Sequence, residues 1–268
     1  MHKKSFIICG LVCITGIFGA FFRWVQNTSA FDPETGLAEP NAFWSWGMAV
    51  FMVLCAVGLI ILIRPLGKYK SCGAYPQSFS GGKLICNAAA FAVLVLMGLG
   101  GLLTAVDAAR ASFSAGMSAV LFEFIGGLFA IGCAVCLFSL LRGVNSAKNT
   151  TGRTPFIVVV LFMCFRLINE YKTCASDPVL WHFAVRILAI SAVLLAFYYL
   201  AGFCFDRAKT SRTIYFSYLG IILCISSLAD SVSAAYHLIT LGQTVSLLVF
   251  SLLLVGNLTP ETPPEQTE

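Results

Sequence analysis

Charged residues are scarce in this chain of 268 residues. Only 11% are Asp, Glu, Lys or Arg, whereas 59% are hydrophobic, and the mean hydropathy is +0.89. A soluble domain carries about 25% charged residues, so a chain this apolar cannot cover a water-facing surface. Lipid must solvate much of it, and in lipid a helix satisfies its own backbone hydrogen bonds. The composition therefore predicts an all-α integral membrane protein surrounded by the lipid bilayer.

Motifs of known enzyme classes are missing as well. The sequence contains no P-loop, no G-x-S-x-G, no H-E-x-x-H and no paired acidic motif of a membrane protease. No segment between the apolar runs is long enough for a soluble catalytic domain. The net charge of +5 is spread over short loops, which gives no support for nucleic-acid binding. We therefore assign no catalytic residues and expect no nucleic-acid partner.

Metal-binding patterns are weak. Nine of the eleven cysteines lie inside apolar runs, where cysteine behaves as a small core residue. Cys133 and Cys136 form a C-x-x-C within such a run, but no second pair accompanies it, so a core role is favoured over metal binding. We predict neither a metal site nor a cofactor.

Eight apolar runs are separated by charged or turn-rich breaks, and each approaches the roughly 20 residues that span a bilayer. They lie near residues 5–24, 42–63, 84–106, 116–141, 155–171, 179–205, 213–232 and 236–256. The pattern predicts a polytopic bundle of about eight transmembrane helices. The first run is longer than the apolar part of a usual signal peptide, so we expect it to be retained.

Lysine and arginine are unequally divided between the two sets of loops. Twelve fall on one side: Lys3, Lys4, Arg64, Lys68, Lys70, Lys83, Arg142, Lys148, Arg153, Arg207, Lys209 and Arg212. Three fall on the other: Arg23, Arg110 and Lys172. Because basic loops stay in the cytoplasm, we predict a cell-membrane protein with both termini cytoplasmic. The C-terminal segment over 257–268 ends in a Pro/Glu/Thr-rich stretch and is predicted to be a disordered cytoplasmic tail.

The two halves of the chain resemble each other. Residues 22–27 (FRWVQN) parallel residues 165–170 (FRLINE), and an Asp-Pro follows each, at Asp32 and Asp177. Residues 102–107 (LLTAVD) parallel residues 225–230 (ISSLAD). Four spans return the chain to the same side, so two such units would be parallel repeats. The pattern predicts a 4 + 4 tandem repeat with units over 1–141 and 142–256. The alternative interpretation is chance similarity among apolar helices.

Polar and ionisable residues within the spans collect in the outer half, where they should face protein or a water-filled cavity. Arg166, Asn169 and Glu170 fall at i, i+3 and i+4 and share one helix face. His182 and Arg186, at i and i+4, are expected to do the same. The candidate substrate-binding residues are Arg23, Asp107, Glu123, Arg166, Asn169, Glu170, His182, Arg186 and Asp230.

Several functions are compatible with this cluster. Arginine recognises carboxylate or phosphate and the acids can hold an ammonium group, which favours recognition or transport of a small anionic or zwitterionic solute through an outward-facing site. Alternatively, ion pairs of Arg166 with Glu170, and of Arg186 with Glu123 or Asp230, only fix helix packing in an accessory or sensory membrane protein. The third interpretation is an intramembrane enzyme that depends on Glu123 or His182.

Small residues spaced four apart mark sites where helices approach closely in membranes. They occur at Gly16 and Ala20, at Gly101 and Ala105, and at Gly126 and Ala130. We predict close packing within the bundle there, with contact to a membrane partner or a second copy as the alternative.

Overall fold

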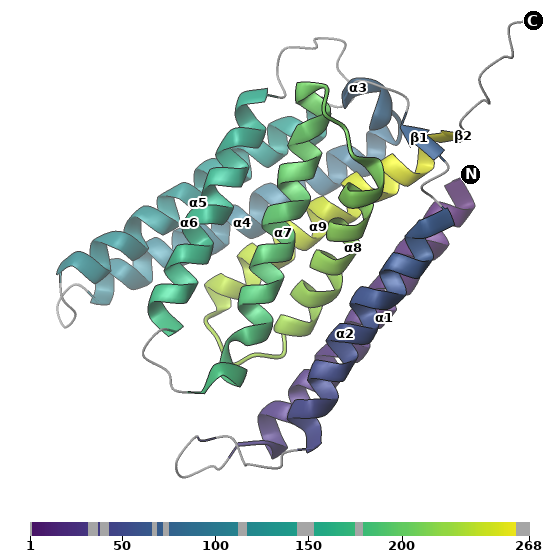
Figure 1. Cartoon of the computed structure of the whole chain (residues 1–268). Helices are drawn as coiled ribbons and strands as arrows, with labels where there is room; N and C mark the ends of the chain where they lie inside the picture. The colour runs from purple at the N-terminus through teal and green to yellow at the C-terminus, as the bar shows by residue number, and fades with distance from the viewer. Residues whose placement is uncertain are drawn as a thin grey trace, which may run out of the picture.

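The computed structural model describes residues 2–31, 37, 43–65, 69–71, 75–111, 117–143, 153–174 and 179–260. These described ranges contain eight long helices: α1 (His2–Ser29), α2 (Phe43–Ile63), α4 (Lys83–Ala111), α5 (Met117–Gly143), α6 (Arg153–Cys174), α7 (Ala184–Gly202), α8 (Thr210–Ser227) and α9 (Ala234–Gly256). Figure 1 shows how they are arranged. Shorter helical pieces are α3 (Tyr75–Ser78), η2 (Leu180–His182) and η3 (Phe203–Phe205). The prediction of an all-α helical bundle is confirmed in this coarse form.

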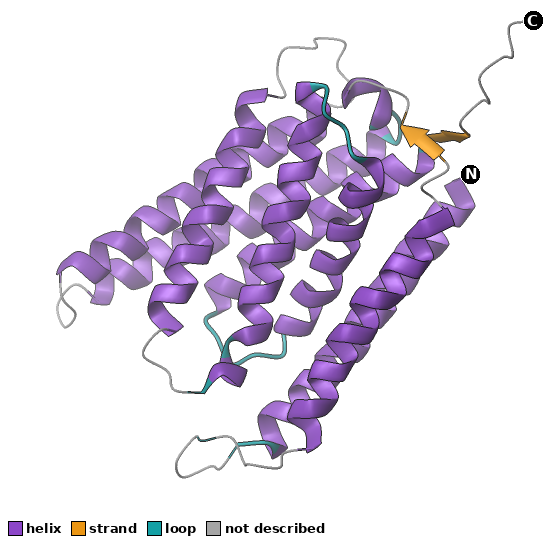
Figure 2. Cartoon of the chain, viewed as in Figure 1, coloured by secondary structure: helices purple, strands orange, loops and turns teal. Residues whose placement is uncertain are grey.

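One small ribbon of two strands interrupts the helical architecture (Figure 2). Strand β1 (Tyr69–Ser71) pairs antiparallel with β2 (Leu258–Pro260), in a register that places Lys70 opposite Thr259. The side chain of Asn257 donates hydrogen bonds to the carbonyls of Ser78 at 3.1 Å and Ser80 at 2.7 Å. The segment predicted as a tail over 257–268 is therefore structured at its start, and residues 261–268 lie outside the described residues.

Among the described residues, seven helices are long and apolar enough to cross a membrane: α1, α2, α4, α5, α6, α7 and α9. The exception is α8, which has 18 residues and begins with the polar sequence Thr210-Ser211-Arg212-Thr213. At 1.5 Å per residue it measures about 27 Å, slightly less than the roughly 30 Å of a hydrocarbon core. Its residues from Ile214 to Ser227 are mostly buried against protein. The multi-pass character is confirmed, and the count of eight spans stays a prediction.

Two predicted boundaries in the second half are wrong. The run over 213–232 ends too late, because α8 stops at Ser227 and Asp230 lies in the turn before α9. The run over 179–205 begins with η2, and the α-helix starts only at Ala184. Both errors fall beside Asp230 and His182, whose polar contacts are described below.

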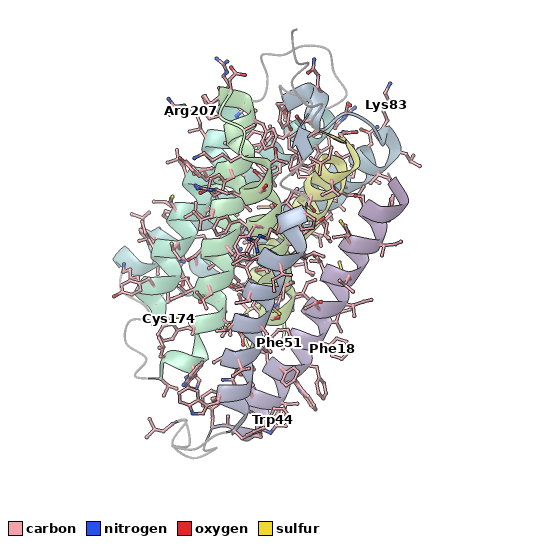
Figure 3. All side chains as sticks on the ribbon, turned by 45° about the vertical axis from the view of Figure 1, so that its right-hand side comes forward. Phe18, Trp44, Phe51, Lys83, Cys174 and Arg207 are labelled. Atoms are coloured by element: carbon pink, nitrogen blue, oxygen red, sulfur yellow. The ribbon has the colours of Figure 1, made fainter. Side chains whose placement is uncertain are left out.

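Helix α9 is the most deeply buried of the candidate spans and packs against α4, α8 and α1. The α1–α2 hairpin lies along α8 at one edge of the bundle, and the start of α1 and the end of α9 lie at the same end of the molecule (Figure 1). Lys83 and Arg207 are found toward that end, and Trp44 lies at the opposite end (Figure 3). The helices therefore alternate in direction between a basic end and an end that carries tryptophan.

Helices α4 and α5 approach each other closely through facing glycines. A Cβ atom added to Gly101 would lie 2.7 Å from the carbonyl oxygen of Gly127, and one added to Gly127 would lie 2.6 Å from that of Gly101. A Cβ at Gly127 would also approach Ala105. The close packing predicted for Gly101 and Ala105 is confirmed, since any larger side chain would force these backbones apart.

The two halves of the bundle have unlike neighbours. Helix α1 packs mainly on α8 and α2, whereas its expected counterpart α6 packs on α5 and α7. Helix α4 lies against α5 and α9, whereas its counterpart α8 lies against α7, α1 and α9. The Asp-Pro pairs at 32–33 and 177–178 lie outside the described residues. The tandem repeat over 1–141 and 142–256 thus stays a prediction.

Candidate functional site

A cavity of about 370 Å³ lies among α4, α5, α6, α7 and the start of α9. Its lining comes from the late turns of α4 and α6 and from the early turns of α5, α7 and α9, so it lies toward the end of the bundle opposite the start of α1 and the end of α9. Its volume falls within the range of about 300–1,000 Å³ that is usual for small-molecule sites. Six of the nine predicted site residues line it: Asp107, Glu123, Arg166, Asn169, Glu170 and Arg186.

One face of α6 supplies much of the lining. Its residues recur every three or four positions, which is the spacing of a single helix face: Phe162, Phe165, Arg166, Asn169, Glu170 and Thr173. The face is aromatic deep in the bundle and polar toward the end of the helix. Arg166, Asn169 and Glu170 thus line the same cavity, as their spacing predicts.

Arg166 is buried, with 8% of its surface exposed. Its Nη1 donates to Gln243 Oε1 at 2.5 Å and its Nη2 donates to Thr240 Oγ1 at 2.7 Å. The guanidinium carbon lies 4.4 Å from the centre of the Tyr236 ring, a distance suited to a cation–π contact. Within the described residues no carboxylate comes within 4.0 Å of this guanidinium. The predicted ion pair of Arg166 with Glu170 is therefore wrong, and neutral groups hold the charge.

Helix α9 provides these neutral groups from one face. Ser233 caps the helix by accepting a hydrogen bond from the amide of Tyr236 at 3.3 Å, which sets the first turn beneath Arg166. Thr240 and Gln243 follow one and two turns later. The Tyr236 hydroxyl is buried and finds no hydrogen-bond partner within the described part of the chain. Tyr236, Thr240 and Gln243 are not among the predicted site residues, although their spacing of four and three inside an apolar run indicates a shared helix face.

Glu170 is held by Arg186. Arg186 Nε donates to Glu170 Oε1 at 2.7 Å, and Arg186 Nη2 lies 3.4 Å from Cys174 Sγ. Both charged side chains are largely buried, with exposures of 14% for Arg186 and 13% for Glu170. The expected pairing of Arg186 with Glu123 or Asp230 is therefore wrong.

Two acids of the lining keep no such partner. Asp107 on α4 and Glu123 on α5 are exposed, and neither makes an ion pair with any residue that the structure describes. The cavity therefore offers a buried arginine without a carboxylate and two carboxylates without a cation.

The remaining predicted site residues form a second cluster, which we call the Arg23 clamp and define as Arg23, Asp230 and the backbone carbonyls of Trp181 and His182. Arg23 is only 1% exposed and forms an ion pair with Asp230 at 2.5 Å. Its Nη1 donates to Trp181 O and its Nη2 to His182 O, both at 2.9 Å. The clamp joins α1 to η2 and to the α8–α9 turn, so the charges of Arg23 and Asp230 are engaged in contacts between these segments.

Neighbouring amides complete the Arg23 clamp. Gln26 accepts a hydrogen bond from Arg23 Nη1 at 2.8 Å and donates to Ser45 of α2 at 3.2 Å. Asn27 donates to the carbonyl of Ala229 at 3.1 Å and to Asp230 Oδ1 at 3.3 Å. Four segments distant in sequence are therefore fixed together at the tryptophan-bearing end of the bundle.

His182 does not share a face with Arg186. It belongs to η2, which ends before α7 begins at Ala184, so the predicted i, i+4 helical relation does not form. Its ring lies 4.4 Å from that of Phe31, measured between ring centres. His182 therefore contributes to the Arg23 clamp through its backbone and is absent from the cavity lining.

Within the described ranges, no group of three or more His, Cys, Asp or Glu side chains is arranged to hold a metal ion. Comparison of the chain with protein-family models, with curated proteins and with solved structures gives no match.

Proposed function

We propose that the protein recognises or transports a small zwitterionic solute in the cavity beside Arg166. The observation that carries this proposal is the state of Arg166, a buried guanidinium whose described partners are all neutral. A charge in this environment is costly unless a partner, water or a ligand compensates it. A solute carboxylate supplies the missing negative charge and matches the planar fork of arginine.

The acids of the lining complete the zwitterionic site. Asp107 and Glu123 lack cationic partners among the described residues and can hold an ammonium group. Phe162, Tyr236 and Ile239 offer apolar surface for the rest of the solute. A simple anion would satisfy Arg166 but would leave both acids facing it, so a solute with both charges fits better.

The Arg23 clamp offers a comparison within the same chain. Arg23 and Arg166 occupy matching positions in the sequence similarity between the halves, and so do Asp230 and Asp107. Arg23 closes on Asp230, whereas Arg166 and Asp107 line a cavity without pairing. Arg23 and Asp230 contact each other directly. We infer that Arg166 and Asp107 are instead bridged by a solute that binds between them.

The second candidate is an accessory or sensory protein whose buried charges serve only packing. The Arg23–Asp230 and Arg186–Glu170 pairs favour this second candidate, because in each pair the two charges compensate each other within the protein. It does not account for Arg166, Asp107 and Glu123.

The two candidates differ in their response to added solute. We expect L-leucine or L-phenylalanine to raise the melting temperature of the detergent-purified protein in a concentration-dependent way. Phenylpropionate, which lacks the ammonium group, and phenethylamine, which lacks the carboxylate, should give a smaller shift. An Asp107→Asn, Glu123→Gln double variant serves as a matched control and should lose the preference for the zwitterion over phenylpropionate. The absence of any shift with all compounds would contradict the proposal and favour the accessory role.

We further propose that all eight long helices cross the membrane and that both termini are cytoplasmic. Reporter proteins fused after Glu268 and within residues 27–40 should then report opposite sides of the membrane, because one helix crossing separates the N-terminus from that loop. The cavity would open on the outer side, away from the basic loops. Two reporters on the same side would contradict this topology, and a C-terminus outside the cell would indicate that α8 does not cross.

A further inference from the structure

A second cavity lies at the basic end of the bundle, far from the Arg166 site in the fold. It has a volume of about 440 Å³ and lies between the end of α2 and the start of α8. Ile60, Ile61 and Ile63 form its apolar wall, and the first two are 56% and 67% exposed. Exposed isoleucines on a membrane-spanning helix face the hydrocarbon, so this wall is continuous with the lipid-facing surface of α2.

Polar side chains gather at the rim of the same cavity. Arg64 follows the last residue of α2, while Ser211 and Arg212 belong to the first turn of α8 and Tyr215 to the second. Both arginines are exposed, and neither makes an ion pair with any residue in the described ranges. Two helix ends thus place two uncompensated cations and two hydroxyls at the edge of the hydrocarbon region.

We propose that this second cavity, called the groove below, binds an anionic phospholipid from the leaflet on the basic side of the membrane. The phosphate lies between Arg64 and Arg212, where the planar guanidinium groups match its oxygens and the Ser211 hydroxyl can donate to it. An acyl chain lies along Ile60 and Ile61. Basic pockets between spanning helices on the cytoplasmic side are a recognised form of lipid site. A free phosphate ion would use the arginines and leave the isoleucine wall unoccupied, so a lipid is the occupant that fits both halves of the groove.

The proposal is independent of the solute site, because no residue is shared between the two cavities. It also gives a role to the loose packing at this edge of the bundle. Among the described elements, α1 and α8 are the main neighbours of helix α2, and Ile60 and Ile61 near its end remain largely exposed. A lipid wedged between α2 and α8 would add contacts where the protein itself supplies few.

The test compares lipids by thermal melting and by native mass spectrometry of the full chain in detergent. Phosphatidylglycerol should raise the melting temperature and remain attached as one retained lipid, whereas phosphatidylcholine and inorganic phosphate should do neither. In an Arg64→Gln, Arg212→Gln variant the apparent affinity for phosphatidylglycerol should fall about fivefold for each arginine removed.

The matched control is Lys83→Gln, Arg142→Gln, which removes the same charge at the same end but outside the groove. It should bind phosphatidylglycerol like the unmodified protein. An equal loss in this control would show general charge attraction and overturn the proposal. Equal protection by inorganic phosphate or by phosphatidylcholine would overturn it too. If the double variant does not fold, the single variants Arg64→Gln and Arg212→Gln allow the retained lipid to be counted directly, and unchanged counts in both would contradict the site.

Discussion

Replacing Arg23 by alanine is expected to destabilise the protein more than any other single change of a charged residue. Arg23 is 1% exposed and its loss leaves the carboxylate of Asp230 buried without its cation. Breaking a buried ion pair by removing one partner typically lowers the free energy of unfolding by about 3–5 kcal/mol. The carbonyls of Trp181 and His182 would also lose their donor. The measurement is thermal melting of the purified protein in detergent.

A double variant separates the effect of losing the ion pair from the effect of losing side-chain volume. An Arg23→Met, Asp230→Leu double variant removes both charges while keeping bulk, and should recover much of the stability lost in Arg23→Ala. The matched control is Arg186→Ala, which breaks the more exposed pair with Glu170 and should cost less. Equal melting of Arg23→Ala and the unmodified protein would contradict the structural role of the clamp, because it would mean that Asp230 finds water or another partner.

The amino-acid sequence indicates which residues matter here but not how they pair. Arg23 and Asp230 both stand out in it as polar groups at the outer ends of spans. Their pairing depends on α1 lying against α8, a contact between segments about 200 residues apart that hydrophobic periodicity does not encode. The same limit explains the wrong partners predicted for Arg166 and Arg186. The i, i+4 spacing of Arg166 and Glu170 puts them on one face without deciding whether they pair, and hydropathy does not place Arg186 relative to acids on other helices.

The boundaries that failed have a related cause. Apolar residues continue from α8 toward Ala229, so composition alone extends the run to residue 232. The helix stops earlier because Asp230 must turn toward Arg23 and Asn27. Tertiary polar contacts thus determine where α8 ends, which local hydropathy does not determine.

The cavity was partly predictable because helix periodicity is local. The spacing of Arg166, Asn169 and Glu170 places them on one face whatever the surroundings. The α9 residues Tyr236, Thr240 and Gln243 are not among the predicted site residues, because an uncharged polar residue in an apolar run costs little and is a weak signal in a sequence. These residues contact the Arg166 guanidinium, so the neutral half of the site is visible only in the fold.

Arg166 gives the prediction with the largest expected effect on binding. Arg166→Met keeps much of the side-chain length but removes the charge and the donors. Hydrogen bonds to charged groups contribute about 1.5–3 kcal/mol each, so losing two donors to a carboxylate should weaken binding of the zwitterion by about 100-fold or more. Arg166→Lys should also bind poorly, because a point charge does not reproduce the fork. The measurement is the concentration dependence of the melting shift for L-leucine or L-phenylalanine.

Stability without solute distinguishes binding from packing at this position. If Arg166 binds a solute, its uncompensated charge lowers the stability of the protein without ligand. The Arg166→Met variant should then melt at or above the temperature of the unmodified protein. Adding Glu170→Ala to Arg166→Ala should not restore stability, because Glu170 is paired with Arg186. Adding Glu170→Ala to Arg186→Ala should restore much of it, which makes this pair the internal control. A large loss of stability in Arg166→Met, recovered by Glu170→Ala, would show that Arg166 serves packing and would remove the main support for a solute site.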